Sequence, residues 1–249
     1  VCMTASVTAN SSVTLNNDNI NNNTTGVMIG AGTLNIGEYN NVNVKNNTSR
    51  GVCITNANSV GRINKAQITG NGKSADSGAG IYTLGTIYTT ASTNVSNNKG
   101  AQGGGICGDG NAVLNINGTP IKDNTAHGCG GGICSYGTLN LSGSTLTGNT
   151  ATGDGGAIWY NKGNISGCGI TGNTANNIGG GVSFSGGTST LTNNHIDNNK
   201  ADQGGGMYMD GYLTISSGTF SNNNASNNGG GILSNGTITM NGGSITNNY

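Results

Sequence analysis

The sequence predicts an all-β fold, a right-handed parallel β-helix (β-solenoid) of about ten coils of roughly 25 residues, forming one domain over residues 1–249. Three observations predict it: a glycine-rich motif in each coil, a second motif ending in asparagine, and an alternating strand between them. The chain has 48 Gly, one Pro and only 7% charged residues. Such a bias accompanies disorder when the composition is aperiodic, but here the apolar residues recur on a fixed period.

The first motif is a run of glycines that ends in an apolar residue. Glycine suits a tight corner that needs positive φ or close approach of two backbones. Clear copies end at Ile106, Ile133, Ile158, Val182, Met207 and Ile232, and weaker copies end at Ile29, Ile54 and Ile81.

The second motif places an apolar residue three positions before an asparagine. Stacking of coils should align these asparagines in a ladder, in which each side-chain amide bonds to the next coil. We also expect the backbone of each of these asparagines to take the left-handed turn that asparagine tolerates. The expected ladder is Asn23, Asn47, Asn71, Asn98, Asn124, Asn149, Asn173, Asn199, Asn223 and Asn248.

Between the two motifs, residues such as 138–141 and 237–240 alternate apolar and polar side chains. Each coil thus offers three short strands and cannot bury its apolar face alone, so neighbours must stack. A strand spacing of ~4.8 Å predicts a rod on the order of 50 Å long. The outward column of the middle strand mixes Asn and Thr, which disfavours an ice-binding alternative that would need a regular Thr array.

Two segments match known repeat motifs letter for letter: the tetrapeptide 155–158 (GGAI) and the tetrapeptide 220–223 (FSNN). They resemble the GGA[ILV] and FxxN motifs of polymorphic outer-membrane proteins and related adhesin-like β-helix repeats, and variants of both cover nearly the whole chain. The resemblance implies a surface-exposed passenger that adheres to host cells.

No catalytic, cofactor-binding or metal-ligating set is predicted. Enzymes that cleave polysaccharides on this fold need two carboxyls roughly 5 to 9.5 Å apart. The one local concentration of ionisable residues holds Asp197, Asp202 and Asp210, with His195 and Lys200. Their positions in the repeat differ, so we expect solvated turn residues, and a polysaccharide lyase or hydrolase is kept as an alternative.

Trp159 and Tyr208 share an outward column two coils apart, where exposed aromatic rings could contact a glycan or a protein partner. Tyr160, Phe184 and Met209, each one position later than a residue of this column, are expected to fill the core. Glycan binding is therefore a further alternative function.

Six cysteines occur, and two of them, Cys107 and Cys134, should stack in adjacent coils, with Cys2 in the same column several coils away. Stacked Cα atoms lie within disulfide range, but parallel Cβ directions suit a disulfide poorly. The cysteines therefore leave the redox compartment open.

A formal net charge of zero argues against nucleic acid as a partner, and no apolar run is long enough to insert in a membrane. The chain opens inside a repeat and ends close to the same phase, which suggests an excised segment whose coils could stack head to tail. We expect a secreted or cell-surface structural solenoid, forming either a homopolymeric filament or the shaft of an adhesin that meets a host glycan or protein.

Overall fold

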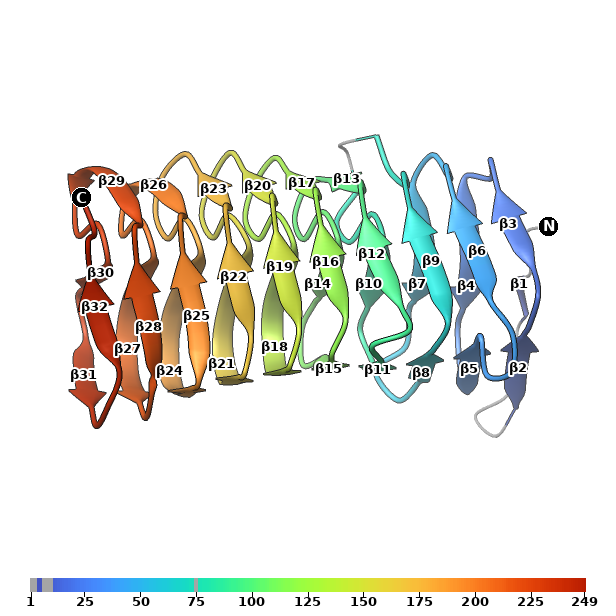
Figure 1. Cartoon of the computed structure of the whole chain (residues 1–249). Helices are drawn as coiled ribbons and strands as arrows, with labels where there is room; N and C mark the ends of the chain where they lie inside the picture. The colour runs from blue at the N-terminus through green and yellow to red at the C-terminus, as the bar shows by residue number, and fades with distance from the viewer. Residues whose placement is uncertain (1–3, 6–10, 74–75) are drawn as a thin grey trace.

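The computed structural model describes residues 4–5, 11–73 and 76–249. All regular structure in these ranges is β-strand, and the strands stack in parallel along one axis (Figure 1). The predicted β-solenoid is confirmed.

The first sheet has 16 strands, arranged as two columns that fuse into long strands in the second half of the chain. One column comprises β1 (Thr4–Ala5), β4 (Thr25–Ile29), β7 (Arg50–Ile54), β10 (Ile81–Thr83) and β14 (Ile106–Gly108). The other comprises β2 (Ser12–Leu15), β5 (Thr33–Ile36), β8 (Val60–Ile63), β11 (Thr86–Thr89) and β15 (Val113–Asn117). They fuse in β18 (Ile133–Ser142), β21 (Ile158–Ser166), β24 (Val182–Thr192) and β27 (Met207–Ile215), and separate again as β30 (Ile232–Ser234) and β31 (Thr237–Met240).

The second sheet has ten strands, one per coil, and so spans nine full turns of the described chain. Its strands are β3 (Asn19–Asn21), β6 (Val42–Lys45), β9 (Ala66–Thr69), β12 (Asn94–Ser96), β16 (Pro120–Lys122), β19 (Thr145–Thr147), β22 (Gly169–Thr171), β25 (Asn194–Asp197), β28 (Gly218–Ser221) and β32 (Ser244–Thr246).

A third sheet of six short strands was not predicted, because four of its strands have only two residues and leave no alternation to read. It consists of β13 (Lys99–Gly100), β17 (Thr125–Ala126), β20 (Thr150–Ala151), β23 (Thr174–Ala175), β26 (Lys200–Gln203) and β29 (Asn224–Asn228), along the upper edge of Figure 1.

The glycine runs pack directly against this third sheet. A Cβ added to Gly131 would lie 2.3 Å from the carbonyl oxygen of Gly156 and 2.6 Å from the amide nitrogen of Thr150. The first glycine of the same run, Gly130, has a φ of 64°. The run therefore meets both requirements that favour glycine, a left-handed backbone at its first position and no room for a side chain at its second.

The core consists of columns of apolar side chains aligned by the parallel register. In the second sheet, for example, Ile121 pairs with Leu146 and Leu146 with Ile170, and all three are fully buried. Tyr160, Phe184 and Met209 are buried as predicted, and the rings of the first two lie 5.0 Å apart between centroids.

Candidate functional surfaces

Ten asparagines form one continuous hydrogen-bonded ladder at the end of the second sheet. Asn124 shows the pattern: its backbone N–H and its Nδ2 both donate to Oδ1 of Asn149, at 3.1 and 3.0 Å. Its Nδ2 also donates to the carbonyl of Val95, at 3.0 Å, and its Oδ1 accepts the equivalent two bonds from Asn98. Each side chain thus joins three successive coils.

The expected left-handed backbone at the ladder asparagines is wrong. Positive φ falls instead on the residue just before each ladder member, for example Asp123 at 53° before Asn124 and Asn222 at 54° before Asn223. In each of these turns one residue adopts the left-handed backbone, and the asparagine after it makes the side-chain hydrogen bonds. The residue before each ladder asparagine is always Asn, Gly or Asp, the residue types that tolerate positive φ, so the sequence does carry a signal for this turn.

The column of Trp159 and Tyr208 is not the exposed flat face that the sequence suggested. Both side chains are half-buried, and Ser183, which lies between them in the register, is fully buried. The Trp159 ring packs on Tyr136 with centroids 4.9 Å apart, and the Tyr208 hydroxyl accepts a 2.7 Å hydrogen bond from Nδ2 of Asn235. The two aromatic residues do not meet.

A shallow hollow of about 410 Å³ lies instead on the outer face of the first sheet. Its wall includes Tyr88, which is 42% exposed, and the stacked carboxamides of Asn115, Asn140 and Asn164. The guanidinium of Arg62 lies over the Tyr88 ring, 5.1 Å from its centroid. An aromatic ring beside a row of amides that can both donate and accept suits a neutral polyhydroxylated ligand.

The candidate carboxylates are distributed over three sheets. Asp197 lies in β25 of the second sheet, Asp202 in β26 of the third and Asp210 in β27 of the first. Hydrogen bonds from Asn227 and Ser226 lower the pKa of the exposed Asp202 carboxyl. As the sequence indicated, these residues therefore lie in different strand columns.

A polar cluster that the sequence did not indicate surrounds Tyr82. Its hydroxyl donates to the Asp109 carboxylate at 3.1 Å, and the Arg50 guanidinium lies 4.3 Å from its ring centroid. Partial burial, and then the Asp109 charge, raise the pKa of Tyr82 to about 12. Arg50 also lies 3.8 Å from the carboxylate of Asp76.

Cys107 and Cys134 pair in register in adjacent coils, as the spacing predicts, whereas Cys2 lies outside the described residues. A different pair of thiols is in contact: Sγ of Cys129 lies 2.8 Å from Sγ of Cys134 in the same coil. The repeat relates residues of different coils in stacked columns, so it carries no signal for a contact made within one turn.

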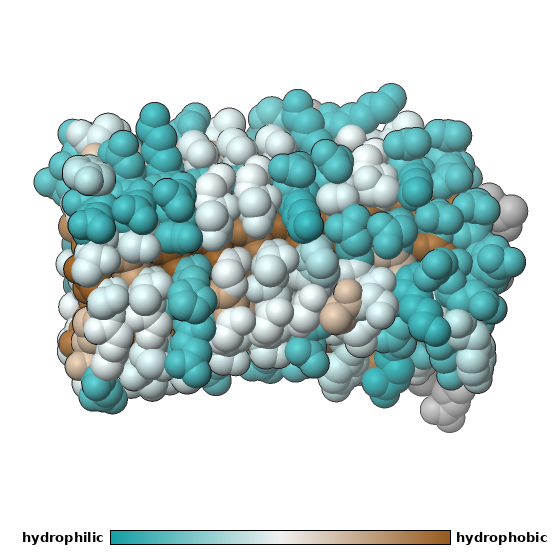
Figure 2. Space-filling model, viewed as in Figure 1, coloured by the Kyte–Doolittle hydropathy of each residue, from teal (hydrophilic) through white to brown (hydrophobic). Residues whose placement is uncertain are grey.

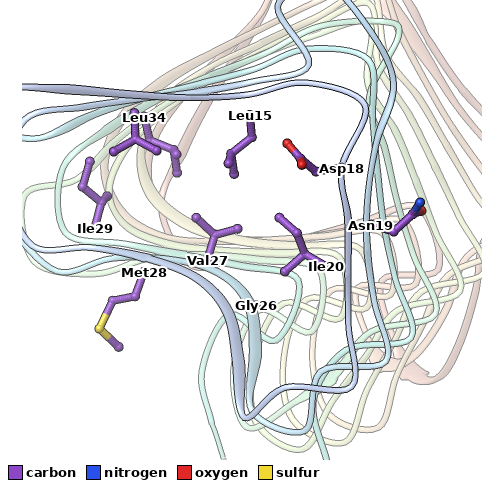
Figure 3. A pocket seen from close by; sticks show the side chains of 10 residues that line it. Leu15, Asp18, Asn19, Ile20, Gly26, Val27, Met28, Ile29 and Leu34 are labelled. Atoms are coloured by element: carbon purple, nitrogen blue, oxygen red, sulfur yellow. The ribbon is translucent and has the colours of Figure 1, made fainter. Parts of the chain in front are cut away.

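A second hollow, of about 180 Å³, lies at the N-terminal end of the described stack. Figure 3 shows Leu15, Val27, Ile29 and Leu34 around it. These residues belong to the same columns as the core of later coils. The hollow is therefore a part of the core rather than a separate site.

The face seen in Figure 2 is hydrophilic or of intermediate hydropathy, with a narrow apolar line along the long axis. In the described ranges no helix is long and apolar enough to cross a membrane. Among the same residues, no group of three or more His, Cys, Asp or Glu side chains is placed to hold a metal ion.

Comparison with protein-family models, with curated proteins and with solved structures finds no significant match. What is shown of the chain is therefore its parallel β-solenoid architecture.

Proposed function

We propose that this chain is an extracellular structural β-solenoid that serves as a rigid shaft. The observation that carries the proposal is the asparagine ladder. Side-chain bonds join every successive pair from Asn23 to Asn248, and the eight members between them are buried. Bending the stack at any coil would break hydrogen bonds that water cannot replace, which costs about 1–3 kcal/mol for each buried group.

The extracellular location is supported by the resemblance of the repeat motifs to adhesin passengers. An antibody raised against the purified chain should label intact cells of the source organism as strongly as permeabilised cells. Labelling that requires permeabilisation would refute this location. An antibody against a cytoplasmic protein of the same cells is the control.

The shaft itself is tested by solution scattering of the purified chain. A stiff stack of ten rungs should give a rod-like cross-section region and a length on the order of 50 Å. A broad distribution of dimensions, typical of a chain that bends between coils, would contradict a rigid shaft.

The same architecture supports a filament of head-to-tail copies. In the last coil Met240 and Ile245 are 40% and 47% exposed, whereas Ile215 and Phe220, their partners one coil earlier, are buried. A coil from a second copy stacked in register would cover both through a heterologous contact that does not close. Further coils of the same polypeptide would cover them equally well.

Sedimentation and electron microscopy over rising concentration separate the two versions. A filament predicts growing assemblies that Ile245→Asp disrupts. Tyr212→Asp, an exposed change in the coil before the last one, should leave them intact. A species of 24.6 kDa at all concentrations would exclude the filament and would agree with a monomeric shaft.

A second candidate function, glycan binding, is favoured by the hollow beside Tyr88. Aromatic rings stack on the apolar faces of sugars, and carboxamides bond their hydroxyls. Loss of glycan-array binding in Tyr88→Ala, with binding retained in Trp159→Ala, would support this site. Equal binding by the wild type and Tyr88→Ala would exclude it.

A further inference from the structure

The turn between Cys129 and Cys134 brings two thiols together. Three glycines separate Cys129 from Ile133, and Gly130 doubles the chain back so tightly that an added Cβ would lie 2.1 Å from the carbonyl oxygen of Ile133. The two sulfur atoms lie 2.8 Å apart, against about 2.05 Å in a disulfide bond. A small side-chain movement is therefore enough to join them.

The two thiols have unequal surroundings. Cys129 is half-buried, and a hydrogen bond from the Cys134 thiol lowers its pKa. Cys134 is fully buried, and burial raises its pKa well above the usual value. A partly exposed thiol that ionises readily, next to a buried second thiol, is the arrangement of an attacking and a resolving cysteine.

This pairing belongs to one coil and does not follow from the repeat. The residue before the glycine run is Gln102 in the preceding coil and Asp154 in the following one. The Tyr136 hydroxyl, which lies 3.9 Å from Sγ of Cys129, donates to the side-chain oxygen of Gln102 at 2.5 Å. The turn that carries Cys129 is thereby linked to its neighbouring coil.

We propose that Cys129 and Cys134 are a redox-active dithiol that closes to an intrachain disulfide by exchange with a small-molecule disulfide such as oxidised glutathione. The Cys129 thiolate attacks one sulfur of the oxidant, forms a mixed disulfide and expels a first glutathione thiolate. The Cys134 sulfur then attacks Sγ of Cys129 and expels the second glutathione, which takes up the Cys134 proton. Two protein thiols are oxidised and one disulfide is reduced to two thiols.

Cys107 is the competing partner, because it pairs with Cys134 in the register and is almost fully buried. Trypsin separates the two possibilities without any substitution. Cys129 and Cys134 lie together on the peptide 123–162, whereas Cys107 lies on the peptide 100–122.

The experiment equilibrates the full chain in glutathione buffers from reducing to oxidising, then blocks free thiols with N-ethylmaleimide in denaturant and maps the tryptic peptides. In reducing buffer we expect the peptide 123–162 to carry two alkyl groups. In oxidising buffer it should carry none and be two hydrogens lighter than the dithiol form, while the peptides holding Cys107 and Cys168 stay alkylated. The proposal would be overturned if the peptide 123–162 were doubly alkylated at every ratio of reduced to oxidised glutathione. A disulfide between the peptides 100–122 and 123–162 would overturn it as well.

The variant Cys134→Ser gives an independent reading. Without the resolving thiol, Cys129 should retain one bound glutathione, seen as a mass adduct on the peptide 123–162. Cys107→Ser is the matched control and should still form the disulfide. If Cys129 of Cys134→Ser carries no glutathione in the oxidising buffers of the same series, the attacking role of Cys129 is contradicted. The test does not depend on the structural function proposed above.

Discussion

At the scale of single residues, the ladder asparagine has two amide protons and one oxygen, and the structure uses all of them. Asn173, for example, donates to Asn199 and to the carbonyl of Leu146, and accepts from Asn149. Aspartate lacks the donors, which explains why Asp123 fills the position before the ladder but not the ladder itself.

Replacing one ladder member should therefore be costly. Asn124→Ala removes the acceptor of the buried N–H of Asn98 and of one of its two Nδ2 protons, and it removes a donor to the carbonyl of Val95. The other Nδ2 proton of Asn98 keeps its bond to the carbonyl of Ile68. At about 1–3 kcal/mol for each unsatisfied group, we expect a loss of at least ~3 kcal/mol in the free energy of unfolding, measured by urea denaturation. Asn140→Ala, an exposed asparagine of the first sheet, is the control and should change it by less than about 0.5 kcal/mol.

Tyr82 predicts a stability change at high pH. Its folded pKa of about 12 exceeds the ~10 of an unfolded tyrosine, so the folded state holds the phenol proton longer. This contribution to stability is fully present below pH ~10 and is lost as the pH rises towards about 12. Tyr82→Phe should have a flatter pH dependence of the denaturation midpoint across this window. An unchanged slope would assign the effect to other tyrosines.

At the scale of elements, large and small side chains compensate within individual coils. Facing positions of the first sheet pair Ile54 with Gly61, whose added Cβ would lie 2.6 Å from the Ile54 Cδ1. In another coil the order is reversed, and a Cβ on Gly108 would lie 2.9 Å from Cδ2 of Leu114. In these two coils one large side chain fills the space between the two positions, from one side or the other, as close packing requires.

This compensation predicts a rescue. Gly108→Ile should overpack against Leu114 and destabilise the chain by about 1–3 kcal/mol. Adding Leu114→Gly copies the natural arrangement of Ile54 and Gly61 and should recover part of the loss. The double-mutant cycle in urea measures the coupling, and additive effects of the two changes would show that these side chains do not share one space.

Much of this architecture could be predicted from the sequence, because every coil repeats the same periodic signal. The core positions of Tyr160 and Phe184 followed from strand alternation alone. The third sheet, the half-burial of Trp159 and the contact between Cys129 and Cys134 could not be predicted. Four strands of the third sheet are too short to alternate, and the contacts of Trp159 with Tyr136 and of Cys129 with Cys134 join residues that the period of the repeat does not relate.

At the scale of the whole molecule, each described coil pairs its strands with the coils immediately before and after it. Stability in such a stack is approximately a sum of coil terms and nearest-neighbour interfaces. The nine-turn structure therefore depends on the phase of the repeat more than on any one coil, as long as the ladder and the inward columns stay in register.

Removing one whole coil should therefore be tolerated, whereas removing half of one should not. Deleting residues 125–149 joins Asn124 to Thr150 in the phase that Asn149 now occupies, and Asn124 would meet Asn173 as its next ladder partner. We expect a folded rod shorter by ~4.8 Å in solution scattering, with the β-sheet circular dichroism retained. Deleting 125–136 instead puts the downstream inward columns out of phase with those upstream, and should give an aggregated or partly unfolded chain. If both deletions behaved alike, phase would not be what holds the coils together.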